Sequence, residues 1–241
     1  MKTKSLITTI IFITTLSAAN AQLRTGIKGG VNISWFTKAV DPFDVNSEYY
    51  SDYAGFRKHV RTGITGGFFV MYDASNFFSF GTEVLYSGRG NVHRVENRDA
   101  IQVDNEGNQQ FAYDTYTYKI DYVELPLYVQ RNLAHISNTG LDFYAGIAPA
   151  YAFHKKRVYT YYDVSGYVDN TDKQKRTRPL EDVRNFNIFP IAGIKLGGST
   201  GFFDLRASLP FYPVFTSSSA PGGGNLSTRM WTIALTGGFY F

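Results

Sequence analysis

The 241-residue chain contains no cysteine, which excludes disulfide bonds, thiolate catalysis and thiolate metal sites. A lipid-modified N-terminal cysteine is excluded for the same reason. Long apolar runs are missing too. The apolar stretch from Leu6 to Leu16 is shorter than the roughly 20 residues that a membrane-spanning helix needs, and no later segment supplies a longer run. Any insertion into a membrane would therefore have to use β-strands.

The N-terminal residues predict a secretory signal peptide. Lys2 and Lys4 form a positive region before the apolar stretch, and Ala19-Asn20-Ala21 supplies a small-residue cleavage site after it. We expect residues 1–21 to be removed and residues 22–241 to form one mature domain. Loss of the two lysines lowers the formal net charge from +4 to +2. Because the remaining charges of both signs are dispersed, we expect no nucleic-acid partner.

What the chain has in quantity is aromatic residues and glycine, with 18 Tyr, 20 Phe and 23 Gly. Near the C-terminus these residues alternate. The odd positions from Trp231 to Phe241 are mostly large and apolar, and the even positions are smaller and more polar. Upstream, Phe203 and Leu205 alternate with charged residues. A period of two with charges on one side indicates a half-buried strand, and in a membrane barrel the apolar side meets lipid.

Eight such segments can be traced, and they predict an all-β fold, an eight-stranded antiparallel up-and-down transmembrane β-barrel. Short turns alternate with long polar loops between them. We therefore expect long extracellular loops, short periplasmic turns, both termini in the periplasm and a place in the cell outer membrane. The predicted strands are residues 25–36, 61–73, 77–90, 116–132, 139–155, 184–198, 201–211 and 227–241, and the predicted long loops are residues 37–60, 91–115, 156–183 and 212–226.

Four segments resemble signature strands of a known family. Residues 26–34, 80–90, 122–127 and 143–149 are similar to strands of the PorT-like outer-membrane β-barrel family of Bacteroidetes. The resemblance spans essentially the whole mature chain. It implies the barrel fold and a place in the cell envelope, and the role of the namesake in gliding and type IX secretion makes these processes candidates for this chain.

An eight-stranded barrel has an interior just wide enough for side chains to fill it, and charges inside must be paired. We expect a structural salt-bridge network that plugs the lumen, the alternative being a narrow channel. The alternation changes phase near Tyr122, and a β-bulge at Tyr122-Val123 would turn Glu124 inward beside Asp121. The predicted lumen charges are Lys28, Glu83, Lys119, Asp121, Glu124, Asp142, Lys195, Asp204 and Arg206.

The sequence predicts no catalytic residue, no metal site and no cofactor. One enzymatic alternative stays open, in which His154, placed on the inward face at the outer rim, acts on lipid or peptide with Asp163 and Ser165 of the next loop. Residues 104–108 faintly resemble part of a calcium loop, but the downstream bidentate glutamate is lacking, so we expect an ordinary polar turn.

Specificity is expected in the long loops, where tyrosines and cations suit contact with a protein or a glycan. Cations near the outer rim can also pair with lipopolysaccharide phosphates. The alternative is that these segments are solvated extensions of the strands. We predict a non-enzymatic barrel whose partners are outer-membrane lipid, lipopolysaccharide and other envelope proteins. The predicted contact residues are Tyr49, Tyr50, Lys155, Lys156, Arg157, Tyr159, Tyr161, Lys173, Lys175 and Arg176.

Overall fold

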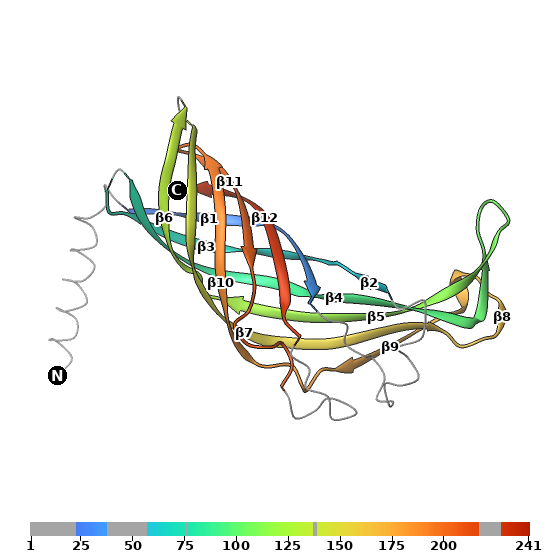
Figure 1. Cartoon of the computed structure of the whole chain (residues 1–241). Coiled ribbons are helices and arrows are strands. Elements are labelled where there is room, and N and C mark those ends of the chain that lie inside the picture. The colour runs from blue at the N-terminus through green and yellow to red at the C-terminus, as the bar shows by residue number, and fades with distance from the viewer. Residues whose placement is uncertain (1–22, 38–56, 76, 137–138, 217–227) are drawn as a thin grey trace.

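Twelve β-strands form one sheet in the computed structural model, which describes residues 23–37, 57–75, 77–136, 139–216 and 228–241 (Figure 1). Within these ranges the pairings are antiparallel, apart from a short parallel pairing of β4 with β8. The strands are β1 (Leu23–Phe36), β2 (Arg57–His59), β3 (Arg61–Asp73), β4 (Phe78–Val103), β5 (Gln109–Glu124), β6 (Leu127–Ile136), β7 (Thr139–Tyr162), β8 (Gly166–Tyr167), β9 (Lys173–Pro179), β10 (Phe186–Gly197), β11 (Gly201–Ser208) and β12 (Met230–Tyr240), and a short 3₁₀ turn, η2, spans Asn170–Asp172. No helix in the described part of the chain is long and apolar enough to cross a membrane.

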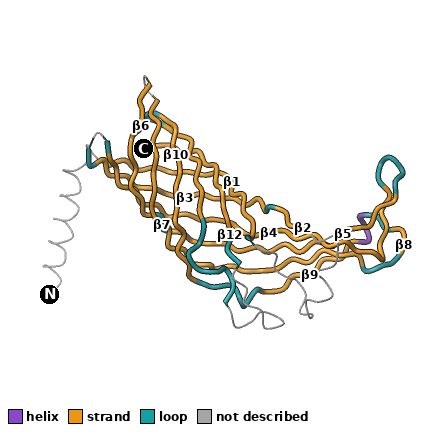
Figure 2. The backbone as a smooth tube through the Cα atoms, viewed as in Figure 1, coloured by secondary structure: helices purple, strands orange, loops and turns teal. Residues whose placement is uncertain are grey.

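The strand pairings return to their starting point, so the sheet closes into a barrel (Figure 2). From β1 the order runs through β3 and β4, then through β5 and β6 to β7, and through β10, β11 and β12 back to β1. Both β5 and β6 lie between β4 and β7. Leu125 and Pro126 separate these two strands, and Pro126 lacks the N–H that the ladder needs there.

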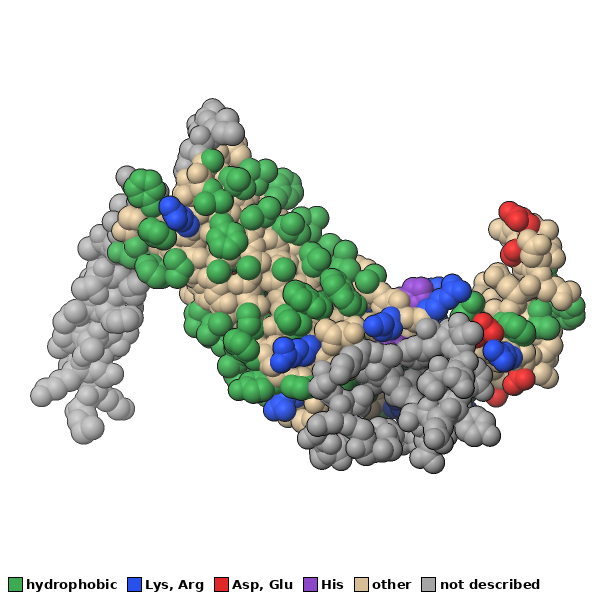
Figure 3. Space-filling model, in the orientation of Figure 1, with side chains coloured by type: hydrophobic (Ala, Val, Ile, Leu, Met, Phe, Trp, Pro, Cys, Tyr) green, Lys and Arg blue, Asp and Glu red, His purple; other side chains and the backbone are tan. Residues whose placement is uncertain are grey.

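An apolar belt covers the outside of the barrel. On β11, Phe203 and Leu205 are exposed whereas Asp204 and Arg206 are buried, which confirms the predicted facing of this strand. Figure 3 shows hydrophobic side chains spread over the same part of the molecule. Aromatic side chains mark both borders of the belt, as they do in membrane barrels. They include Tyr86, Tyr151, Phe153 and Phe186 at one border and Tyr72, Phe78, Phe239 and Phe241 at the other.

Beyond one border, the sheet continues as an extension that we call the paddle (Figure 1). It consists of β2, β8, β9 and the distal parts of β4, β5 and β7, residues 91–103, 109–119 and 155–162. The predicted loops 91–115 and 156–183 are thus largely strand. Their polar composition suggested loops, because strands beyond the apolar belt no longer carry an apolar outer face.

One glycine marks the start of the paddle. Gly90 has a φ of 151°, a conformation that favours glycine. A Cβ atom at this position would also collide with the carbonyl oxygen of Tyr118 on the neighbouring strand. The close approach of β4 and β5 at this point therefore depends on glycine.

The inner face of the paddle is packed by tyrosines around one carboxylate. Tyr159 stacks on Tyr116 with ring centres 4.3 Å apart, and on Tyr161 at 4.5 Å. The Tyr159 hydroxyl donates to Asp114 over 2.9 Å, and the Tyr162 amide donates to the same carboxylate over 3.2 Å. Burial raises the pKa of Asp114 in spite of these hydrogen bonds. The packing explains why this segment is sheet and not loop.

Some sequence predictions lie outside the described residues or differ at their ends. The signal peptide, Tyr49 and Tyr50 lie outside the described ranges, as do most of the predicted loops 37–60 and 212–226. The predicted turn at residues 133–138 is different, since β6 continues to Ile136 and pairs with Thr139.

Candidate functional site

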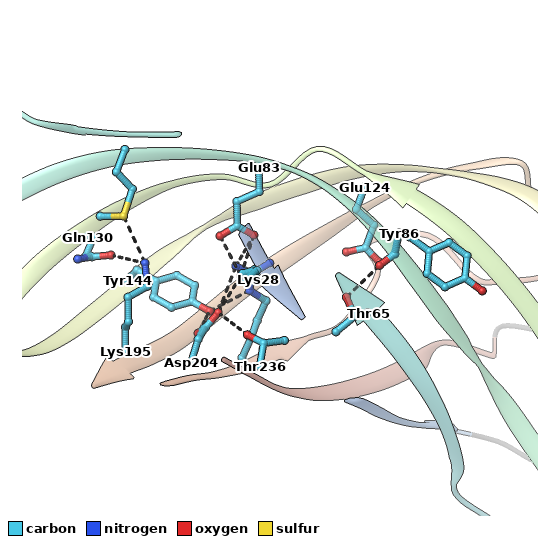
Figure 4. Close-up of polar contacts among 12 residues, drawn as sticks. Lys28, Thr65, Glu83, Tyr86, Glu124, Gln130, Tyr144, Lys195, Asp204 and Thr236 are labelled. Atoms are coloured by element: carbon cyan, nitrogen blue, oxygen red, sulfur yellow. Dashed lines mark hydrogen bonds and ion pairs between the residues drawn. The ribbon is translucent and has the colours of Figure 1, made fainter. Parts of the chain in front are cut away.

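The centre of the barrel is held by two cations and two carboxylates from three strands (Figure 4). Lys28 Nζ lies 2.9 Å from the Glu83 carboxylate and 2.8 Å from that of Asp204. Arg206 lies 2.8 Å from Glu83 and donates to the Tyr144 hydroxyl over 2.9 Å. Tyr144 in turn donates to Asp204 over 2.6 Å. All four charged side chains are buried, so each one needs these partners.

A second buried ion pair lies nearer to the paddle. Arg89 contacts Glu124 at 2.6 Å and packs 4.2 Å from the centre of the Phe189 ring. Its guanidinium also donates to Ser87 and Ser208. The sequence prediction placed Glu124 inward but beside Asp121, and it missed Arg89. Glu83 and Arg89 are six residues apart on β4, so strict alternation puts both side chains on the inward face. This pattern in the sequence could have identified Arg89 as a lumen residue.

Little space remains between these two clusters. The cavity that Lys28, Arg89, Glu124 and Asp204 help to line has a volume of about 10 Å³. A single water molecule needs about 10–15 Å³, so the middle of the lumen is filled by side chains.

A wider vestibule of about 570 Å³ opens at the end of the barrel where β1 begins and β12 ends. Lys195 lies at its inner limit, 2% exposed, with Nζ 3.1 Å from the Gln130 side-chain oxygen and 4.6 Å from the Phe202 ring centre. Asp142 lines the vestibule and accepts from Gln130 and Asn132 at 2.7 Å. These two predicted lumen residues therefore belong to the mouth of the barrel and not to its central network.

Lys119 and Asp121 do not lie in the lumen, contrary to the sequence prediction. The buried residues of β5 are the even ones through Glu124, so the odd positions face outward. The phase change inferred at Tyr122 does not occur on β5. Its physical counterpart is a bulge on the neighbouring strand, where Asp121 pairs with His154, Tyr122 pairs with Ala152, and Phe153 is the additional residue of β7.

The same bulge turns His154 outward. Its side chain is 49% exposed, and Nδ1 lies 3.0 Å from Asp121. Asp121 also accepts a hydrogen bond from the Tyr86 hydroxyl at the border of the apolar belt. The arrangement considered for an enzyme does not form, because β7 runs on to Tyr162 before Asp163 and Ser165, roughly 25 Å along the strand from His154.

The outer face of the paddle carries an excess of cations. Cross-strand partners point to the same face, and Lys119 lies opposite Lys156 while Arg57 lies opposite Arg94. Burial lowers the pKa of Lys119, and the nearby charges of Arg61, Lys156 and Lys175 lower it further. Figure 3 shows Lys and Arg side chains gathered with a histidine where the hydrophobic surface ends.

The predicted contact residues are divided between the two faces of the paddle. Lys156 and Lys175 face outward, and β9, which carries Lys173, Lys175 and Arg176, is exposed along its length. The others face inward. Lys155 donates to the Val183 carbonyl and to Asn185, Arg157 pairs with the inward Tyr118, and Tyr159 and Tyr161 belong to the stacked tyrosines. No cluster of three or more metal-ligating His, Asp or Glu side chains occurs among the described residues.

Comparison with known families gives the assignment. The model of the outer membrane protein beta-barrel domain matches residues 18–217, which is more than half of the chain. The chain belongs to this family. This outer-membrane barrel thus combines a side-chain-filled lumen with a paddle that extends beyond the apolar belt. A comparison with curated proteins finds no match.

Two solved structures, Ail and OprG, are similar to this outer-membrane barrel. Ail, the attachment invasion locus protein of Yersinia pestis, is 9% identical with a TM-score of 0.40, covering 91% of this chain and 99% of Ail. OprG from Pseudomonas aeruginosa is 9% identical with a TM-score of 0.37, covering 90% of this chain and 95% of OprG.

Proposed function

We propose that the protein crosses the outer membrane with eight strands and that its lumen conducts nothing. The observation that carries this proposal is the central ion-pair network, in which Lys28, Glu83, Asp204 and Arg206 neutralise one another and leave almost no space. The count of eight takes β5 and β6 as one transmembrane strand, since both lie between β4 and β7.

In this proposal the paddle is extracellular, and the vestibule and both termini of the mature domain, residues 22–241, are periplasmic. This orientation is supported by the different lengths of the connections at the two ends of the barrel. The turn at Ser199 and Thr200 is short, whereas the other end carries the extended strands of the paddle. Outer-membrane barrels have short periplasmic turns and long external segments. Residues 1–21 serve as the cleaved signal.

The biological role that follows is non-enzymatic. A filled lumen leaves recognition to the surfaces, and the paddle is the largest surface beyond the apolar belt. The barrel thus anchors a paddle that engages envelope components or an accessory complex. The resemblance of residues 80–90 and 122–127 to PorT-like strands supports gliding or type IX secretion as the process.

A cross-linked pull-down of the tagged protein from its native outer membrane, with recovered proteins identified by mass spectrometry, tests this role. The informative variant replaces residues 98–111 with Asn-Gly, which joins Asn97 to Ala112 at a point where they are already paired. We expect the unaltered protein to recover a stoichiometric envelope complex and the shortened variant to lose it. The matched control, Ser75→Ala at the opposite end, should recover the complex unchanged. Recovery of the barrel alone from the unaltered protein contradicts an accessory role.

The channel alternative has its own experiment. Planar-bilayer recordings of the purified barrel should stay at background conductance. Reproducible current steps that disappear in Glu83→Ala or change their selectivity in that variant would show that ions pass through the network.

A further inference from the structure

The outer face of the paddle brings like charges together without neutralising them. Directly opposed like charges destabilise a pair of strands. Lys119 nevertheless lies opposite Lys156, and Arg61 and Lys175 are close enough to Lys119 to lower its pKa. We call Lys119, Lys156 and Lys175 the cationic cluster.

Within the described residues, none of the three forms an ion pair with a carboxylate. The nearest carboxylate on this face is Asp121. It is already engaged by His154 at 3.0 Å and by the Tyr86 hydroxyl. The cluster therefore keeps a local positive charge that an external anion can neutralise.

The position of the cluster relative to the membrane indicates where that anion comes from. The border of the apolar belt next to the paddle contains a row of exposed side chains from three adjacent strands. This row consists of the register partners Tyr86, Val123 and Tyr151. Lys119 lies four residues before Val123 on β5, about 13 Å further along the strand. With the strand tilt of a barrel, the cluster lies at the level of the lipid headgroups, about 5–10 Å above the hydrocarbon.

We propose that the cationic cluster binds the phosphate groups of an outer-leaflet glycolipid, lipid A. Ammonium groups form short charge-assisted hydrogen bonds with phosphate oxygens. An anion placed between Lys119 and Lys156 turns their repulsion into two attractive contacts. The acyl chains of the same lipid lie against the apolar belt below, where Tyr86 and Phe153 are exposed. This inference rests on the proposed extracellular position of the paddle.

A soluble acidic protein is less suited to this surface. The cluster continues directly into the lipid-facing side of β5 and β7 with only the row of Asp121 and His154 between them. A ligand that carries phosphate and hydrocarbon on one molecule matches both surfaces at once. The exposed cations of β9 at the edge of the sheet would be the better place for a protein partner.

The test uses the full mature barrel in nanodiscs that contain bisphosphorylated lipid A, and in parallel discs that contain the dephosphorylated form. Lipid retained after extraction with mild detergent is quantified by mass spectrometry. The informative variant is Lys119→Gln with Lys156→Gln. The matched control, Lys58→Gln with Arg176→Gln, removes two positive charges from the opposite face of the same sheet.

We expect the unaltered protein and the control to retain bisphosphorylated lipid A equally, and the Lys119/Lys156 variant to retain roughly 10- to 30-fold less. The dephosphorylated lipid should be retained weakly by all three. Equal retention of both lipids by the unaltered protein, or equal losses in variant and control, would overturn the assignment.

Membrane insertion is followed separately through the heat-modifiable gel mobility of each protein. Insertion without a preference for phosphate overturns the lipid A site alone. Failure of the unaltered protein to insert overturns both this site and the proposed function, so the two failures can be told apart.

Discussion

Glu83 is the carboxylate on which both cations of the central network converge within 3 Å. It accepts from Lys28 and Arg206, and both cations are buried with it. Replacement by Gln removes the charge but keeps the size of the side chain. The two cations would then share the one remaining carboxylate, Asp204.

We expect Glu83→Gln to lower the free energy of unfolding of the barrel by about 3 kcal/mol, because it leaves buried positive charge uncompensated. Urea unfolding in lipid vesicles, followed by tryptophan fluorescence and gel mobility, measures this change. Glu96→Gln, whose carboxylate pairs with Arg98 on an exposed part of the paddle, should change stability by less than about 1 kcal/mol. Equal effects of the two substitutions would contradict the role assigned to the network.

The sequence predicts correctly which side chains face the lumen where apolar and polar residues alternate without interruption. Lys28, Glu83, Asp204 and Arg206 were found because strict period-two patterning places them opposite lipid-facing residues. Lys119 and Asp121 were misplaced because the inward face of β5 is itself apolar. Tyr118, Ile120 and Tyr122 are buried there, and in the sequence they resemble a lipid-facing row.

The bulge on β7 determines which side chains of this strand face the interior of the paddle. Phe153 is the additional residue, and after it Tyr159 faces inward while Lys156 faces outward. Deletion of Phe153 would move every later residue of β7 to the opposite face.

Deletion of Phe153 should therefore open the paddle while the barrel stays inserted. We expect trypsin to cut at Lys175 and Arg176 roughly tenfold faster than in the unaltered protein, because Tyr159 can no longer stack on Tyr116. Phe153→Ala, which keeps the additional residue, serves as the control and should resemble the unaltered protein. If the deletion leaves the cleavage rate unchanged, the bulge does not set the facing of β7.

Asp114 gives the paddle a pH dependence of known sign. Burial raises its pKa in the folded paddle, so the folded form holds its proton more firmly than the open form. The paddle is then most stable at pH values below about 4, the usual pKa of aspartate, and loses stability as the pH rises through the raised value.

Hydrogen exchange at the Tyr162 amide, which donates to Asp114, measures this effect once intrinsic exchange rates are corrected. Protection should fall between pH 4 and pH 7. In Asp114→Asn, which cannot ionise, protection should be independent of pH over this range. A rise in protection with pH in the unaltered protein would contradict the raised pKa.

The sequence pattern predicts the ends of a strand correctly only where the strand ends near the apolar belt. The predicted bounds of β3 agree with the structure at both ends, and those of β1 differ by two residues. These strands end close to the belt, where the apolar pattern also ends. β4, β5 and β7 were predicted too short, because beyond the belt cross-strand pairing continues without an apolar face to reveal it.

At the scale of the whole molecule, the proposed orientation can be tested by cysteine labelling, since the chain has no cysteine of its own. A cysteine at Gln109, exposed on the paddle, should react in intact cells with a maleimide that cannot cross membranes. A cysteine at Ser75, exposed at the opposite end, should react only after the outer membrane is permeabilised. The reverse pattern would place the paddle in the periplasm.

The ion pairs of Lys28 also bear on how the barrel is assembled. Lys28 lies on the first strand and Asp204 on β11, 176 residues later, with β12 between them. A growing barrel therefore lacks the Lys28–Asp204 and Arg206–Glu83 contacts until its last strand joins its first, and hydrocarbon does not tolerate charges that are only partly neutralised. Closure of the seam and completion of the ion-pair network are one event. The insertion machinery must shield the unfinished sheet from lipid until that event, and no stable half-built barrel is expected to accumulate in the membrane.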